Sequence, residues 1–386
     1  MNQPCRLVLC CLAAFVWIGT LPAQGQQPFR TDADSQDSKL PWFQLKPAEF
    51  PPEGSAHYFV GELIDVDHVE RIGTLRIDRT DAQRRSHWDL PVDFELLPYG
   101  AIYYHGAPAE LRDIPIGTHL HGLFYIKGKG EEGTRAVFHN RASLEKDFTR
   151  AFQLEDDFSY YARQGRAWRI DSVNLAENSM LATGVSTADG KADKQQTQFE
   201  ILPATRVWKG RQIAGLKDLN KGQVVQLNLT WATLYGPGRC SDIWLDEESR
   251  SVATAQQLEI HRQHQKERGL AGWIDEVDNQ QRIVKVTLFG GIDPKLVDEF
   301  QPETSVTAVV AEPSLRSYDQ VNDRKSGPLL EKKSVSPAPG SSGVQIVFQP
   351  SLLLEGFRPG RIVRLFSSGW PVVSIPLEER LWPARD

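Results

Sequence analysis

The feature that most constrains this chain is a stretch of sequence that occurs twice, about one domain length apart. Residues 94–106 read FELLPYGAIYYHG, and residues 199–210 read FEILPATRVWKG. The likeness continues downstream, where Gly117 corresponds to Gly222. This period is too long for the repeats of a solenoid, so each copy is expected to fold as a domain with its own core.

A third, more divergent copy follows the first two. It places Gly360 where they have Gly117 and Gly222. The expected first strands of the copies align, and each ends in an Asx residue: Asp67, Asn174 and Asp278. Side chains of this type bond to the backbone of a turn. Residues that all copies share are therefore interpreted as framework, and residues that one copy has alone are the candidates for function.

Within each copy, short runs of alternating apolar and polar residues lie between Gly, Pro and Asx residues, which is typical of β-strands. In the first copy these runs are 57–66, 73–78, 92–97, 101–105 and 118–126. Five short strands suffice to close a small barrel, which removes exposed sheet edges. The sequence predicts an all-β protein of three tandem small, OB-like β-barrel domains joined by short helices.

The repeats also set the domain boundaries. Connecting helices are predicted at 151–165 and 255–269, because the apolar residues of the first share one helical face. The predicted units are a signal peptide (1–25), an N-terminal linker (26–54), a first barrel (55–147), a connecting helix with a second barrel (148–250), and a connecting helix with a third barrel (251–386). Residues 316–343 are rich in Ser, Pro, Gly and Lys, which predicts a disordered insert in the third barrel.

The repeated pattern can be compared with known domains. The order G-x-L-x-x-V-D, then alternating strands, then L-x-D-L-x-x-G-x-x-V resembles small OB-like β-barrel domains of exported bacterial proteins, many of them of unknown function. The resemblance rests on glycines and apolar positions that set a barrel. It implies the fold and its tandem repetition, and it brings no functional residue with it.

The N-terminus predicts export. Residues 1–25 combine one positive charge, an apolar run of about fifteen residues and small residues before Gln26, as secretory signal peptides do. A retained anchor and a lipid modification at Cys10 are the alternatives. Cleavage would leave Cys240 as the single cysteine, so no internal disulfide is expected. The predicted location of the mature chain is the periplasm or the extracellular space.

Charge narrows the possible partners. The formal net charge is −6, and no long basic run occurs, so nucleic acid and anionic lipid are poor partners for this surface. Beyond the signal peptide no stretch is apolar enough to span a membrane. The expected partner is a polysaccharide or another envelope protein, and no cofactor is predicted.

The first copy carries the sharpest candidate site. His119 and His121 would share one face of a strand, which is a metal-ligand spacing when a third ligand is near. In the repeat alignment His121 occupies the position of Gln226 and Arg364. The pair is therefore expected to face outward, onto a solvated surface.

Two other pairs of residues are candidate sites, one aromatic and one acidic. Tyr104 aligns with Trp208, just before a turn glycine in each copy, and these aromatics could bind a sugar ring by stacking or could close the end of a barrel core. Asp171 and Asp275 occur in two copies only and could act in acid–base chemistry.

No nucleophile elbow, phosphate-binding loop or His-Glu-x-x-His motif occurs in the sequence. The sequence favours an exported, non-catalytic binding or scaffold protein of the cell envelope. The alternative is a metal-dependent or carboxylate-based secreted hydrolase that uses the histidines of the first copy.

Overall fold

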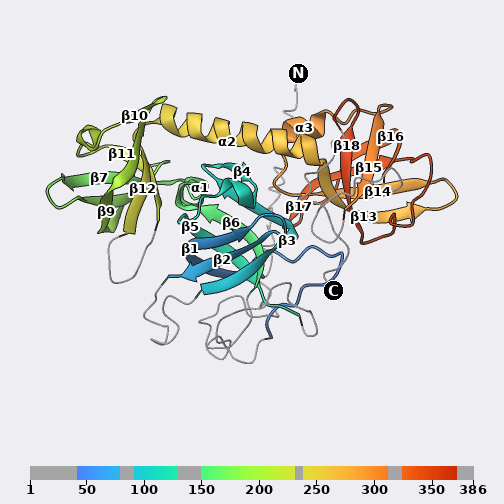
Figure 1. Cartoon of the computed structure of the whole chain (residues 1–386), viewed down its shortest axis with the longest axis horizontal. Coiled ribbons are helices and arrows are strands. Elements are labelled where there is room, and N and C mark those ends of the chain that lie inside the picture. The colour runs from blue at the N-terminus through green and yellow to red at the C-terminus, as the bar shows by residue number, and fades with distance from the viewer. Residues whose placement is uncertain (1–40, 79–90, 129–148, 231–237, 312–323, 372–386) are drawn as a thin grey trace, which may run out of the picture.

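The computed structural model of the protein describes residues 41–78, 91–128, 149–230, 238–311 and 324–371. The predicted signal peptide, with Cys5, Cys10 and Cys11, lies outside these ranges. Figure 1 shows three β-domains along the chain, with one long helix, α2, running above the first of them. Of the helices in the described ranges, none is long and apolar enough to cross a membrane.

The first domain is a closed ring of five strands. Its strands are β1 (His57–Asp67), β2 (Ile72–Ile77), β3 (Pro91–Tyr104), β5 (His119–Tyr125) and β6 (Arg150–Asp156), and a short strand β4 (Ala107–Ala109) forms a hairpin with the end of β3. The ring runs β1–β2–β3–β6–β5 and back to β1. Only the β3–β6 pair of this ring is parallel. Leu63, Phe94 and Leu120 are among the side chains that fill its core.

The second domain repeats this connectivity. Its elements are β7 (Arg166–Asn174), β8 (Ser179–Ser186), β9 (Ala192–Lys209), β10 (Gln212–Ala214), β11 (Val224–Leu229) and β12 (Gly238–Trp244). The ring runs β7–β8–β9–β12–β11, and again the β9–β12 pair is parallel. The sequence repeat therefore reflects two barrels with the same strand order.

The third domain is a barrel with different connectivity. It contains β13 (Leu270–Asp278), β14 (Ile283–Phe289), α3 (Pro294–Asp298), β15 (Ser305–Val310), β16 (Arg324–Ser334), β17 (Ser341–Phe348) and β18 (Ile362–Ser367). Its closed order is β13–β14–β17–β16–β15–β18, and every pair is antiparallel. The predicted all-β class, rich in small barrels, is confirmed, although the third barrel is not a plain copy of the other two.

The three corner glycines occupy equivalent positions, as the alignment predicts. Gly117, Gly222 and Gly360 all have positive φ angles, of 93°, 86° and 81°, a conformation that glycine adopts without steric cost. Each amide donates a hydrogen bond to a carbonyl oxygen of the first strand of its barrel, on Leu63, Ile170 and Ile274, across 2.7, 2.7 and 2.8 Å. This corner is the framework that all three barrels share.

Two helices connect the barrels, and each begins at an aspartate N-cap. Asp156 caps α1 (Asp157–Arg163), and Asp246 caps α2 (Glu247–Arg268). Each cap carboxylate also accepts an N–H from the hairpin turn of the barrel before it, from His105 across 3.0 Å and from Gly210 across 3.1 Å. Helix α2 has 22 residues and is therefore about 33 Å long, which lets it reach from the second barrel to the third (Figure 1).

The prediction of a helix at 151–165 is wrong over its first half. Residues 150–156 form β6, so the first barrel extends beyond residue 147, and only the short α1 follows. Ala151 and Leu154 pack in the core of the barrel, whereas Phe152 joins an aromatic cluster outside it. A strand that is buried on both faces has no alternating pattern, so its sequence is easily taken for a helix.

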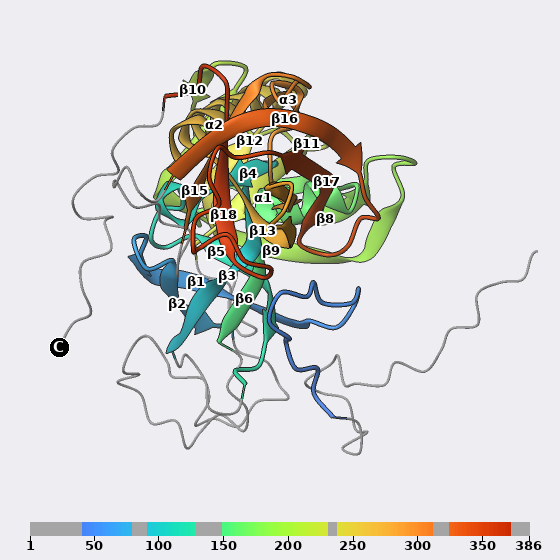
Figure 2. The same ribbon diagram turned by 90° about the vertical axis from the view of Figure 1, so that its right-hand side faces the viewer.

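The predicted disordered insert is also wrong where the structure describes it. Residues 324–334 form β16, and β17 begins at Ser341. Figure 2 shows β16 as a long arched strand across the third barrel. Only Leu329 of this strand is fully buried, so its composition is polar although it is part of the barrel wall. The remainder of the insert, up to residue 323, lies outside the described residues.

The residues predicted as an N-terminal linker contribute to a second kind of core. Phe50 packs against Trp273 of the third barrel, with ring centroids 4.6 Å apart, and against Tyr99 of the first barrel at 5.6 Å. Tyr99 and Trp273 also contact each other directly. The first and third barrels are therefore joined by a shared aromatic cluster rather than by a helix alone.

Candidate functional site

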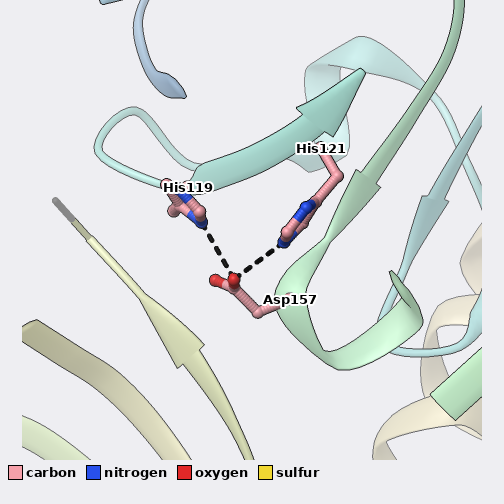
Figure 3. Close-up of side chains that lie close together, drawn as sticks. All are labelled: His119, His121 and Asp157. Atoms are coloured by element: carbon pink, nitrogen blue, oxygen red, sulfur yellow. Dashed lines mark hydrogen bonds and ion pairs between the residues drawn. The ribbon is translucent and has the colours of Figure 1, made fainter. Parts of the chain in front are cut away.

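The candidate site lies on the outer side of the first barrel, under α1. Strand alternation directs Leu120 into the core and sends His119 and His121 to the opposite face. Asp157 is the first residue of α1 and points toward the same place (Figure 3). The site is thus built by β5 and by the N-terminus of the connecting helix.

Both histidines contact the same carboxylate oxygen. His119 Nδ1 lies 2.9 Å from Asp157 Oδ1, and His121 Nε2 lies 3.0 Å from that oxygen (Figure 3). A carboxylate oxygen only accepts, so each ring nitrogen donates to it when no metal is bound.

The remaining polar atoms of the three residues are also engaged. His119 Nε2 lies 3.0 Å from Asp78 Oδ2, and His121 Nδ1 lies 2.6 Å from the Tyr58 hydroxyl. The second oxygen of Asp157 accepts the backbone N–H of Leu229, in the second barrel, across 2.9 Å. The cluster therefore links both barrels with α1.

The prediction of a solvated histidine pair is wrong. His119 is 3% exposed, His121 is 6% exposed and Asp157 is fully buried. The alignment correctly placed the histidines outside the barrel, but it carries no information on what packs over the barrel. In the structure α1 covers this face, and the ring of Tyr160 stacks on His121 at 3.7 Å.

Burial and charge together set the protonation states. Burial lowers the pKa of His119, but the carboxylates of Asp157 and Asp78 outweigh it and raise that pKa to about 10. Burial raises the pKa of Asp157, but His119 and His121 outweigh it and hold the pKa well below its usual range. Without a metal, the neutral-pH cluster therefore contains an ionised Asp157 paired with a protonated His119.

The same atoms could hold a divalent metal ion. One nitrogen of each histidine and one oxygen of Asp157 lie within 4.8 Å of one another, and two imidazoles with a carboxylate suit zinc. The contacts of the opposite ring nitrogens with Asp78 and Tyr58 are of the kind that holds metal-bound histidines in their orientation. The structure thus brings the two predicted ligands together and adds Asp157, which sequence reasoning missed because it read this segment as the middle of a helix.

A neighbouring contact fixes the second barrel to the same helix. Asn228 of β11 is 1% exposed; its Nδ2 donates to Asp156 Oδ2 across 2.8 Å, and its Oδ1 accepts the N–H of Phe158 across 2.8 Å. The N-terminus of α1 is therefore bound on one side by the first barrel and on the other by the second.

The predicted aromatic ligand-binding residues lie elsewhere. Tyr104 is 7% exposed, belongs to the core of the first barrel and stacks on His105 at 3.7 Å. Trp208 is half-buried, and its Nε1 donates to Asp242 Oδ1 across 2.9 Å. The burial of Tyr104 thus favours the alternative in which it closes the end of a barrel core.

The two carboxylates considered for acid–base chemistry have the same structural role in their barrels. Each accepts hydrogen bonds from a threonine and a glutamine on neighbouring strands: Thr183 and Gln196 for Asp171, Thr287 and Gln345 for Asp275. Cys240 lies fully buried in the core of the second barrel, and burial raises the pKa of its thiol. None of these three residues has a reactive environment.

Comparisons with known proteins assign neither a family nor a function to the chain. No protein-family model matches the chain, and no characterised protein or solved structure is significantly similar to it. The resemblance to OB-like domains of exported bacterial proteins therefore stays a prediction.

Proposed function

We propose that the protein is an exported, non-catalytic binding or scaffold protein of the cell envelope, with a polysaccharide or another envelope protein as its partner. The observation that carries the proposal is the burial of the His119–His121–Asp157 cluster between the first two barrels. This is the strongest catalytic candidate among the described residues, and its position suits it to holding domains together.

A catalytic group has to reach its substrate. His119, His121 and Asp157 have at most 6% of their surface exposed, and their outer polar atoms contact other parts of the protein. A substrate could reach them only if α1 moved away, which would break the contacts of Asn228 as well. Such an arrangement supports a structural role.

Helix α2 supports a fixed arrangement of the other barrels. Thr254 Oγ1 donates to the carbonyl of His105 in the first barrel across 2.6 Å, and His261 Nε2 donates to the carbonyl of Gly291 in the third across 2.8 Å. One helix therefore bonds to both domains. A scaffold needs such fixed spacing between its binding surfaces.

The proposal can be tested with purified residues 26–386 and insoluble cell-wall polysaccharide. We expect the protein to sediment with the polysaccharide and to release no soluble fragments. Chemical cross-linking in an envelope extract, followed by mass spectrometry, tests the protein-partner branch. Release of fragments that stops on metal chelation and in Asp157→Asn would overturn the proposal, as would failure to bind in both experiments.

One observation favours the hydrolase as a second candidate function. The three side chains converge as metal ligands do, and each is oriented by a further contact. Elemental analysis of protein purified without chelators distinguishes the cases. Stoichiometric zinc together with hydrolysis supports the hydrolase, whereas stoichiometric zinc without hydrolysis identifies a structural metal.

A further inference from the structure

A second polar site, which shares no residue with the histidine cluster, lies where the first barrel, α2 and the third barrel meet. It is a cavity of about 110 Å³. Its walls are the β1–β2 turn and the β3–β4 hairpin region, the C-terminal half of α2, and residues of β18 and of the segment after β14. This volume holds several water molecules or one small ligand.

The lining of this cavity is strongly basic. One carboxylate, that of Glu110, faces four guanidinium groups, which belong to Arg71, Arg112, Arg268 and Arg364. Arg112 also approaches the neighbouring Asp113 at 3.9 Å. Guanidinium groups present planar sets of donors that match phosphate and carboxylate oxygens. The charge of the lining therefore favours an anion and disfavours a metal cation.

Some of these groups are held in place by the fold. Arg71 Nη1 donates to the carbonyl of Leu97 across 3.2 Å, and Arg364 Nη1 donates to the carbonyl of Arg268, at the end of α2, across 3.0 Å. Arg268 itself is only 7% exposed. Donors fixed in this way bind an anion without a large loss of side-chain entropy.

Two histidines of the cavity have a buried ring nitrogen without a hydrogen-bond partner in the described part of the chain, which favours a ligand that also carries a hydrogen-bond donor. His261 is 2% exposed, and its Nε2–H donates to the carbonyl of Gly291, so Nδ1 is an acceptor in the neutral form of the ring. That Nδ1 has no hydrogen-bond partner among the described residues, and it lies 3.9 Å from the nearest Glu110 oxygen. Nδ1 of His264 is also buried without a partner there.

We propose that this cavity binds a small hydroxylated oxyanion, whose phosphate or carboxylate group is held by the guanidinium groups while a hydroxyl donates to Nδ1 of His261. A sugar phosphate and a uronic acid share this chemistry. The inference goes beyond the proposed function, because it assigns a small-molecule site that a binding or scaffold role does not require. A carboxylate at Glu110 can accept a second hydroxyl of such a ligand.

Calorimetric titration at constant ionic strength tests the proposal with four probes: glucose 6-phosphate, D-glucuronate, glucose and sulfate. We expect saturable binding of at least one of the two hydroxylated anions and no binding of neutral glucose. Binding of the sugar phosphate alone identifies a phosphate ligand, and binding of glucuronate alone identifies a carboxylate ligand. Absence of saturable binding for both at millimolar concentration would overturn the inference.

Variants assign the binding to this cavity. Arg112→Gln removes a charge at the exposed rim and should weaken binding about tenfold, whereas Arg211→Gln, at an exposed position of the second barrel, should leave it unchanged. His261→Phe keeps a ring of similar size but has no acceptor, so it should weaken binding of the hydroxylated anions and leave any binding of sulfate unchanged. Equal losses in Arg112→Gln and Arg211→Gln would show non-specific charge attraction and would contradict the proposal.

Discussion

The side chain of Asn228, in the second barrel, donates a hydrogen bond across 2.8 Å to the carboxylate of Asp156, at the end of the first. Asp156 is at the same time the N-cap of α1. The strand that closes one barrel, the helix that follows it and the next barrel therefore share one buried carboxylate. The repeats are not independent units along a flexible chain, and their stability should be coupled.

Replacing Asn228 with Ala tests this coupling. The change leaves the buried N–H of Phe158 without its partner and removes one of the hydrogen bonds to Asp156, so we expect a loss of at least about 1–3 kcal/mol in the free energy of unfolding. Denaturation in urea, followed by tryptophan fluorescence, measures it. The exposed Asn279→Ala is the control and should change stability by less than about 0.5 kcal/mol. Equal stability of the two variants would contradict the proposed junction.

The ion pair at the candidate site gives a second prediction. Asp157→Asn keeps the shape of the side chain but removes the charge that faces His119, and breaking a buried ion pair costs about 3–5 kcal/mol. We expect the variant to unfold at a clearly lower urea concentration, with chelator present so that no metal contributes. The matched control Asp193→Asn breaks a half-exposed ion pair with Arg166, which should cost at most about 1 kcal/mol.

This expectation replaces the one that follows from the sequence alone. If the histidine pair were solvated, exchanging His119 and His121 for Gln would leave folding unchanged. Because both rings are buried, the double variant should be destabilised like Asp157→Asn. A double variant as stable as the wild type would mean that α1 does not cover this face in solution.

The repeated FEILP and FELLP stretches give a third prediction. Phe199 is 2% exposed and lies in the core of the second barrel, whereas Glu200 faces outward and pairs with Arg239 at 2.9 Å. Phe199→Ala should cost about 3–5 kcal/mol. Glu200→Gln should cost at most about 1 kcal/mol, because its partner is exposed to solvent. Thermal unfolding of the two variants in parallel measures the difference, and comparable losses would contradict the assigned register.

The contrast between Phe199 and His119 shows how far the sequence could predict this structure. Alternation places Phe199 inside a barrel and Glu200 outside it, and positive φ explains why Gly117 recurs in every copy. Alternation is a local pattern, and the corner glycine recurs in each copy, so both can be recognised in the sequence. The environment of His119 depends on how α1 packs over the first barrel and on a contact of Asp157 to the second barrel. These tertiary contacts occur once and leave no local pattern in the sequence.

The sequence also failed to predict two strands, β6 and β16, because the burial of their side chains depends on tertiary contacts. β6 is buried on both faces by two different neighbours, so the adjacent Ala151 and Phe152 are both apolar and the strand shows no alternation. β16 is the opposite case, since Leu329 is its only fully buried side chain. Both strands could be recognised only from the strands with which they pair.

The last prediction concerns the dependence of stability on pH at His264, in the basic cavity. Burial lowers the pKa of His264 to about 3 from an ordinary 6.5, the carboxylate of Glu110 opposes that shift, and Arg112, Arg364 and Arg268 add to it. Between about pH 3 and pH 6.5, His264 is therefore protonated in the unfolded chain and neutral in the folded protein. Stability from the neutral ring is fully present above pH 6.5 and is lost as the pH falls toward 3.

His264→Gln removes this proton-linked loss. Its free energy of unfolding should fall less steeply than that of the wild type between pH 6.5 and about 4, because a glutamine does not titrate. Urea denaturation at several pH values within that range measures the slopes, and the exposed Asn279→Ala, which changes no titratable group, serves as the control, with a slope equal to that of the wild type. Parallel slopes for His264→Gln and the wild type would mean that His264 takes up its proton in the folded protein as readily as in the unfolded chain, so that the cavity around it is open to water.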